Sequence, residues 1–179
     1  MGLANWLTTL RILLIPVFVT LLVYRRPGWA FLVFCAASLT DMLDGYIARR
    51  RGTQTRLGAF LDPVADKLVV AVALVLLVSR DPRALIVLTA IVIIGREITI
   101  SALREWMAEI GARRKVAVSQ LGKYKTILQI TGLSMMLYRV PFLGLPTYRL
   151  GVWLTEIAAA ATLVSMIAYL RAAWPDLKR

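Results

Sequence analysis

Six apolar runs constrain what this 179-residue chain can fold into more than any other feature of its sequence. They lie at Ile12–Tyr24, Pro27–Thr40, Leu68–Ser79, Ala84–Gly95, Thr126–Tyr138 and Ile157–Leu170. The longest has about 14 residues, whereas an unaided membrane-spanning helix is recognised at roughly 18 uncharged residues. Each run is therefore long enough to span only if neighbouring charged residues belong to the same helix and face protein or water.

Composition supports the membrane interpretation. Hydrophobic residues make up 59% of the chain, charged residues 18%, and the mean hydropathy is +0.72, which is too apolar for an ordinary soluble domain. We expect an all-α polytopic membrane protein with about six transmembrane helices, preceded by an amphipathic segment at Asn5–Arg11. No internal repeat or second domain is evident, so residues 1–179 are expected to form a single membrane-embedded domain.

The formal charge of +12 raises the alternative of a nucleic-acid partner. In the six-helix arrangement, 14 of the 22 Lys and Arg residues fall at the termini and in the second and fourth connections, against six in the other three connections. This asymmetry places both termini in the cytoplasm by the positive-inside rule. Basic connections beside anionic lipid headgroups explain the charge without nucleic acid.

Four aspartates stand next to these apolar runs, at Asp41, Asp44, Asp62 and Asp66. A carboxylate at membrane depth costs several kcal/mol (about 2–4) unless it is paired or binds a metal. Spacings of three and four residues put each pair on one helix face. The chain has no histidine and one cysteine, so a carboxylate cluster here suits hard cations such as Mg²⁺ or Mn²⁺. A pair of such ions stabilises in-line displacement at phosphorus.

Other interpretations of the aspartates remain open at this point. They can be helix caps or surface charges near membrane ends, although all four at this spacing are hard to explain in that way. An ion or proton transporter uses intramembrane carboxylates as a pathway, but it predicts carboxylates spread across the membrane depth. A lipid-binding or scaffold protein leaves the aspartates without a role.

The motif around the aspartates resembles a known family. Asp41-x-x-Asp44-Gly45-x-x-Ala48-Arg49, then eight residues, then Gly58-x-x-x-Asp62-x-x-x-Asp66 is similar at every fixed position to the signature of the CDP-alcohol phosphatidyltransferases. NWLTTLR near the start and REITISALREWMAEIG in the fourth connection resemble the subgroup of bacterial phosphatidylglycerophosphate synthases. One departure is Ala4, where that subgroup usually has proline.

The resemblance implies roles for individual residues. Asp41, Asp44, Asp62 and Asp66 would hold two divalent cations, Mg²⁺ or Mn²⁺, and Asp66 would also act as general base. CDP-diacylglycerol would bind at Asn5, Thr8, Gly45, Arg49 and Thr55. The resemblance further implies a homodimer in the bacterial cytoplasmic membrane, with its active site on the cytoplasmic side.

The reaction implied is transfer of the phosphatidyl group from CDP-diacylglycerol to sn-glycerol 3-phosphate, giving phosphatidylglycerophosphate and CMP. The same chemistry with inositol phosphate, serine or phosphatidylglycerol as acceptor is the closest alternative. An acceptor phosphate needs cations, and a charge inside a helix needs a partner or an anionic substrate. We therefore expect Arg96, Arg104, Lys123 and Lys125 to bind the acceptor phosphate, with contacts to lipid headgroups as the alternative.

Overall fold

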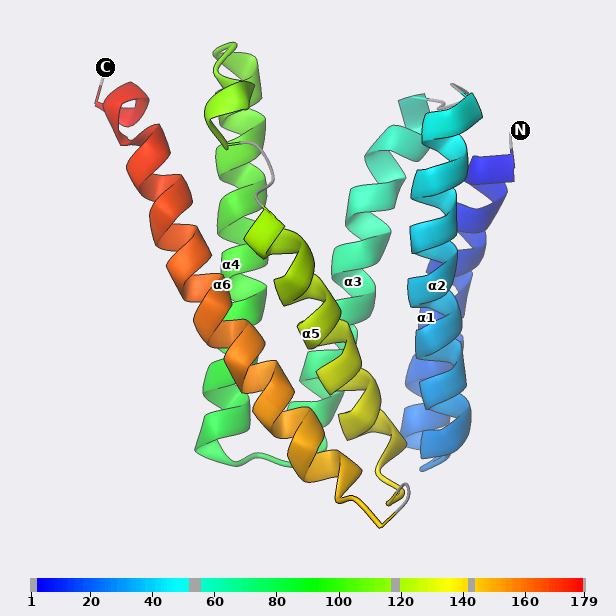
Figure 1. Cartoon of the computed structure of the whole chain (residues 1–179). Coiled ribbons are helices and arrows are strands. Elements are labelled where there is room, and N and C mark those ends of the chain that lie inside the picture. The colour runs from blue at the N-terminus through cyan, green and yellow to red at the C-terminus, as the bar shows by residue number, and fades with distance from the viewer. Residues whose placement is uncertain (1–2, 52–55, 117–119, 142–143, 179) are drawn as a thin grey trace.

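A computed structural model of the chain describes residues 3–51, 56–116, 120–141 and 144–178 (Figure 1). Within the helices, the side chains of residues 3–8, 11, 41–51, 56–63, 66, 113, 115 and 120–123 lie outside the description. The described residues form helices and short connections, without a strand. Helices suit an apolar environment, because each helix satisfies its own backbone donors and acceptors.

Six long helices and one 3₁₀ turn make up the described part of the chain. They are α1 (Leu3–Val23), α2 (Pro27–Arg51), α3 (Arg56–Arg80), α4 (Ala84–Glu109), η1 (Arg113–Val116), α5 (Gln120–Tyr138) and α6 (Thr147–Leu177). Each long helix contains one of the six apolar runs, or nearly all of it, and most continue beyond it into charged sequence. Pro27 occupies the first position of α2, where its missing N–H is not needed.

Two expected boundaries differ from the structure. The segment Asn5–Arg11 is the start of α1 and forms no element of its own. The sequence REITISALREWMAEIG, which we placed in the fourth connection, lies almost wholly in α4, which continues to Glu109, and the polar sequence that follows contains η1. In both places an apolar helix extends through polar residues, because each added residue contributes a helix hydrogen bond and, in α4, Met107 also packs on α6.

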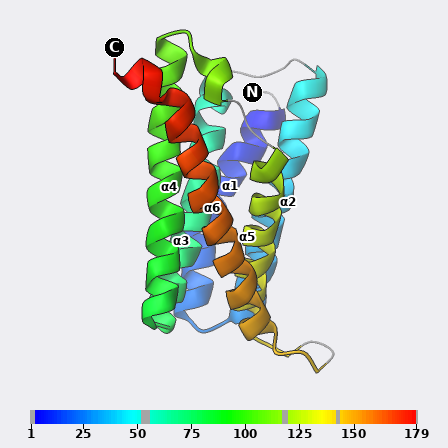
Figure 2. The same cartoon turned by 60° about the vertical axis from the view of Figure 1, so that its left-hand side comes forward.

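Consecutive helices run in opposite directions (Figures 1 and 2). Both termini, the α2–α3 junction and the α4–α5 junction lie at one end, which we call the terminal end. The α1–α2, α3–α4 and α5–α6 connections lie at the other, which we call the opposite end. Helix α5 packs on α6 and α2, while α4 packs on α3 and α6.

Two clusters of buried apolar side chains hold the helices together. The larger one has residues from all six long helices and includes Phe18 and Phe34, whose ring centroids lie 5.8 Å apart. The smaller one lies at the terminal end between α4, η1 and α6, around Met107 and Val116. The smaller cluster fixes the position of α6 beside the part of α4 that carries Arg104, one of the predicted site residues.

Large apolar side chains also cover much of the outer surface, among them Leu13, Val75, Leu88, Ile91, Trp153 and Val164. Soluble monomers rarely expose so much apolar surface. Helices α4 and α6 are long and apolar enough to cross a membrane by length and composition. These features indicate a membrane protein, and the number of spans stays a prediction.

The contact between α5 and α6 depends on two glycines. A Cβ added at Gly132 would fall on the Thr155 hydroxyl and lie 2.9 Å from the carbonyl oxygen of Gly151. A Cβ added at Gly151 would lie 2.7 Å from the carbonyl oxygen of Gly132. Small residues at such a crossing let the two backbones approach closely, which is how helices associate in an apolar medium.

We predict that Gly132→Ala lowers the free energy of unfolding by about 1–3 kcal/mol, because the new methyl group meets backbone atoms that cannot give way. Thermal unfolding of the detergent-solubilised protein measures the effect. Gly95→Ala in α4 is the matched control, since nothing lies within 4 Å of its added Cβ. Equal losses in the two variants would contradict the close α5–α6 contact.

Candidate active site

The four aspartates lie in two helices that contact each other, in the half of each helix nearer the terminal end. Asp41 and Asp44 lie in α2, and Asp62 and Asp66 lie in α3. In Figure 1 the halves of α2 and α3 that carry them lie toward the terminal end, and the two helices are in contact. The structure describes the helical backbone at these positions and not the side chains, so the aspartates' role as metal ligands stays a prediction.

The residues expected to bind the nucleotide belong to the same end. Asn5 and Thr8 lie in the first turns of α1, and Gly45 and Arg49 lie in the last part of α2. Their side-chain contacts lie outside the described part of the chain, and Thr55 lies outside it altogether. The backbone therefore brings these segments to the same end of the bundle as the aspartates, without showing how they contact a ligand.

Basic residues from α4 and α5 form a partly buried group with one carboxylate, which we call the cationic cluster: Arg96, Glu97, Arg104 and Lys125. Nη1 of Arg96 lies 2.6 Å from Oε1 of Glu97, and Nζ of Lys125 lies 3.5 Å from the same oxygen. The side chains of Arg96 and Lys125 are only 10% and 4% exposed. One carboxylate oxygen thus serves two buried cations, which leaves the group with a positive excess.

Arg104 extends this excess toward the terminal end. Its Nη2 lies 3.4 Å from the Tyr169 hydroxyl, and its guanidinium stands 5.4 Å from the centroid of the Tyr169 ring. Eight residues separate Arg96 from Arg104, a rise of about 12 Å along α4. The charge of Lys125 interacts with both arginines. Both arginines repel Lys125 and Glu97 attracts it, so the three cations form one group around a single carboxylate.

Two donors in the cluster have no protein partner. Within the described part of the chain, Nε of Arg96 and Nε of Arg104 are buried and make no hydrogen bond. A buried donor without a partner costs about 1–3 kcal/mol, so it is retained where a ligand or water can satisfy it. Of the four residues expected to bind the acceptor phosphate, Arg96, Arg104 and Lys125 come together here. The side chain of Lys123 lies outside the description.

A polar link between α3 and α4 was not predicted from the sequence. Lys67, the residue after Asp66, donates a hydrogen bond from Nζ to Oγ of Ser101. That hydroxyl in turn donates to the carbonyl oxygen of Glu97 at 2.6 Å. The link joins the helix of Asp62 and Asp66 to the turn of α4 that carries Glu97. A charged residue inside an apolar helix was the one sequence signal that could have pointed to it.

Comparison with known proteins identifies the chain's relatives. Residues 1–170 match the family model of the CDP-alcohol phosphatidyltransferases. The chain belongs to the CDP-alcohol phosphatidyltransferase family. The aspartate motif in α2 and α3 is thus carried by a member of the family whose signature it resembles.

Two relatives within this family are similar over almost their whole length. A Pseudomonas fluorescens protein named CDP-diacylglycerol–glycerol-3-phosphate 3-phosphatidyltransferase is 49% identical, and the match covers 99% of this chain and 93% of the relative. An Escherichia coli K12 protein of the same name is 48% identical over 96% of this chain and 94% of the relative. The family resemblance seen in the sequence is confirmed.

The fold is also shared with solved structures. The Mycobacterium tuberculosis phosphatidylinositol phosphate synthase in its apo form has a TM-score of 0.66 and 23% sequence identity, covering 94% of this chain and 88% of that one. The same synthase crystallised with manganese and citrate has the same TM-score and covers 96% of this chain. The all-helical fold of this chain is therefore shared with the solved structures of that synthase.

We predict that Ser101→Ala lowers the free energy of unfolding by about 1–3 kcal/mol, because it removes the acceptor of a charged lysine that is partly buried between two helices. Thermal unfolding in detergent measures the loss. Ser79→Ala is the matched control, since the Ser79 hydroxyl donates to a backbone carbonyl of its own helix. An equal, small effect of both substitutions would show that the Lys67 link contributes nothing to stability.

Proposed function

We propose that the chain is an integral membrane enzyme that transfers the phosphatidyl group from CDP-diacylglycerol to sn-glycerol 3-phosphate, giving phosphatidylglycerophosphate and CMP. The observation that carries the proposal is the 48–49% identity, over nearly the full length, to relatives named for this activity. The aspartate motif and the buried cationic cluster supply the two kinds of group that this reaction needs: ligands for a metal and donors for an acceptor phosphate.

The aspartates fit a metal site by the chemistry of their donors. Asp41, Asp44, Asp62 and Asp66 offer carboxylate oxygens from two contacting helices, and the chain has no histidine to compete. Such oxygen donors suit Mg²⁺ or Mn²⁺. Divalent ions bound there would supply charge neutralisation at the pyrophosphate as CMP leaves. We propose two ions, and the M. tuberculosis neighbour crystallised with manganese supports a divalent ion in this fold.

The remaining steps belong to residues of the chain. Asn5, Thr8, Gly45, Arg49 and Thr55 bind the CDP moiety and orient its pyrophosphate. Asp66 takes the proton from the 1-hydroxyl of glycerol 3-phosphate, whose oxygen then attacks the β-phosphate in line. The bond that forms joins this oxygen to phosphorus, and the bond that breaks releases CMP. No covalent intermediate with the protein is needed.

The phosphate of the acceptor is assigned to the cationic cluster. Lys125 is the central residue of this assignment, because its charge interacts with Arg96 and Arg104 while it shares Glu97 with Arg96. A phosphate would satisfy the buried Nε donors that the protein leaves without partners. Lys123 is two residues before Lys125 in α5, and it is assigned to the same site only from its position in the sequence.

The membrane arrangement follows from the same proposal. Six helices span the bacterial cytoplasmic membrane as one catalytic domain of residues 1–179, with the terminal end in the cytoplasm. The distribution of Lys and Arg supports this orientation, since 14 of the 22 fall at that end by sequence. A homodimer completes the proposal by resemblance to the family.

A second candidate keeps the chemistry and changes the acceptor to inositol phosphate. The solved neighbour named phosphatidylinositol phosphate synthase favours it, at 23% identity. The relatives named for glycerol 3-phosphate are about twice as similar in sequence, so we place glycerol 3-phosphate first.

We predict that the detergent-solubilised protein releases CMP from CDP-diacylglycerol with Mg²⁺ when glycerol 3-phosphate is the acceptor. Inositol phosphate, serine and phosphatidylglycerol are tested separately, and Asp66→Asn is expected to lower the rate by at least about 100-fold because it removes the proposed base. Release with another acceptor only would overturn the substrate, and an active Asp66→Asn variant would overturn the role of Asp66.

We predict that Lys125→Gln raises the KM for glycerol 3-phosphate by about tenfold or more, since a charged hydrogen bond contributes about 1.5–3 kcal/mol. The KM for CDP-diacylglycerol should change little. Arg114→Gln is the matched control, because Arg114 is an exposed cation in η1 near the same end. A similar rise in both variants would mean that general surface charge, and not the cluster, attracts the acceptor.

A further inference from the structure

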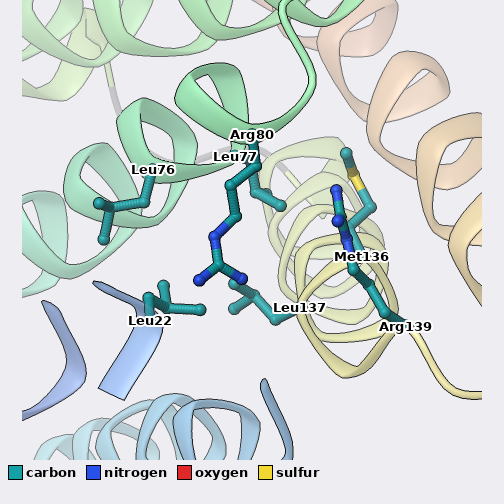
Figure 3. A pocket seen from close by; sticks show the side chains of 7 residues that line it. All are labelled: Leu22, Leu76, Leu77, Arg80, Met136, Leu137 and Arg139. Atoms are coloured by element: carbon teal, nitrogen blue, oxygen red, sulfur yellow. The ribbon is translucent and has the colours of Figure 1, made fainter. Parts of the chain in front are cut away.

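Three arginines meet at the opposite end of the bundle, each at the C-terminal end of a different helix. Arg25 follows α1, Arg80 ends α3 and Arg139 follows α5. Arg80 and Arg139 line one crevice, and the charge of Arg80 is repelled by those of Arg139 and Arg25. Figure 3 shows the Arg80 side chain reaching from α3 across this crevice toward Leu22 and Leu137. We call Arg25, Arg80, Arg139 and the crevice beside them the arginine crevice.

The backbone at two of these residues is strained. Arg25 has φ 55° and Arg139 has φ 58°, a left-handed conformation in which glycine is the usual residue. After α1 the chain closes a regular helix cap, with the amide of Arg26 donating to Leu21 at 2.8 Å and that of Arg25 to Leu22 at 3.0 Å. A side chain in this conformation costs about 1–2 kcal/mol relative to glycine. Strain of this kind is a reason to look for a function of the side chain.

Acidic groups at this end do not neutralise the cluster. The three connections and their flanks carry six arginines, namely Arg25, Arg26, Arg80, Arg83, Arg139 and Arg149, and one acidic residue, Asp81. Asp81 accepts from Nε and Nη2 of Arg83 at 2.8 and 2.6 Å and from the hydroxyl of Tyr148. These hydrogen bonds, that from Arg83 above all, lower the pKa of Asp81 to about 2, so it is ionised and already engaged.

The remaining compensation is partial. Arg139 stacks on the ring of Tyr148, with 4.7 Å between the guanidinium carbon and the ring centroid. Among the described residues, no acidic side chain pairs with Arg25 or Arg80. The helix C-termini beside them contribute about half a negative charge each, which lessens the repulsion without cancelling three full charges.

The walls of the crevice are apolar. Leu22, Leu76, Leu77, Met136 and Leu137 line it around the Arg80 side chain (Figure 3), and all of them except Leu76 are buried. Val23 and Val140 are exposed next to it. Arginine charges beside these exposed apolar side chains suit a ligand with an anionic head and a hydrocarbon body. The planar guanidinium fork matches phosphate oxygens, and all six basic residues at this end are arginine and none is lysine.

We propose that Arg25, Arg80 and Arg139 bind the phosphodiester of an anionic phospholipid in the leaflet at the opposite end, with the lipid's apolar part against the exposed side chains of Val23 and Val140. This site is separate from the proposed active site. Arg80 lies 14 residues after Asp66 in the same helix, a distance of about 21 Å along its axis. The inference therefore stands whether or not the proposed reaction is correct.

The test measures lipid binding to the full-length protein in a neutral detergent by native mass spectrometry, with EDTA present. The probes are dioleoyl phosphatidylglycerol, dioleoyl phosphatidylcholine and inorganic phosphate. The variants are Arg80→Gln and Arg25→Gly, and the matched control is Arg149→Gln, which removes an exposed arginine of α6 at the same end. Arg25→Gly guards against misfolding, because glycine accepts the left-handed backbone and its unfolding temperature should equal or exceed that of the wild type.

We expect the wild type to bind the anionic lipid at least about fivefold more tightly than the zwitterionic one, and each crevice variant to lose about fivefold in affinity for the anionic lipid. Arg149→Gln should retain the preference, and inorganic phosphate should not displace the lipid. Equal binding of both lipids, an equal loss in Arg149→Gln, or a loss in Arg80→Gln without one in Arg25→Gly would overturn the site. Displacement by inorganic phosphate would show a free anion as its occupant and would equally overturn the lipid assignment.

Discussion

The cost of leaving polar groups unsatisfied in apolar surroundings governs this structure. Backbone groups are satisfied within helices, and several charged side chains in the apolar segments are paired with other side chains. Glu97 is the clearest case, because a single oxygen of its carboxylate meets both Arg96 and Lys125. Helices α5 and α6 approach closely at Gly132 and Gly151, because neither glycine has a Cβ to meet the backbone of the other helix.

Much of the fold follows from local patterns in the sequence. Each apolar run predicts a helix because its length and composition favour one locally, and Pro27, Pro82 and Pro141 lie in or directly beside connections in the structure. The ends of the helices were predicted less well. Helix α4 continues to Glu109 because Arg104, Met107 and their neighbours pack on α6, and that packing depends on residues about 65 positions away in the chain. A local pattern does not contain this information.

The candidate site divides in the same way. The aspartate spacing is local, so the sequence alone places each pair on one helix face and relates the chain to its family. The three basic residues of the cationic cluster were predicted from the sequence, but the part played by Glu97 and the internal arrangement were not. Whether Lys125 meets Glu97, and whether Lys67 reaches Ser101, depends on how α3, α4 and α5 are rotated against one another.

Counting charges by connection describes orientation, but packing decides whether a given charge is satisfied. Lys125 and Arg80 are both basic residues in otherwise apolar helices, and their surroundings differ. Lys125 shares a carboxylate with Arg96 inside the bundle, so its charge is partly balanced before any ligand binds. Arg80 faces two further arginines, while the one carboxylate at its end is held by Arg83 and Tyr148. An excess of positive charge near an anionic leaflet is stabilised by the lipid itself, so the membrane supplies at the opposite end the counter-charge that Glu97 supplies within the cluster.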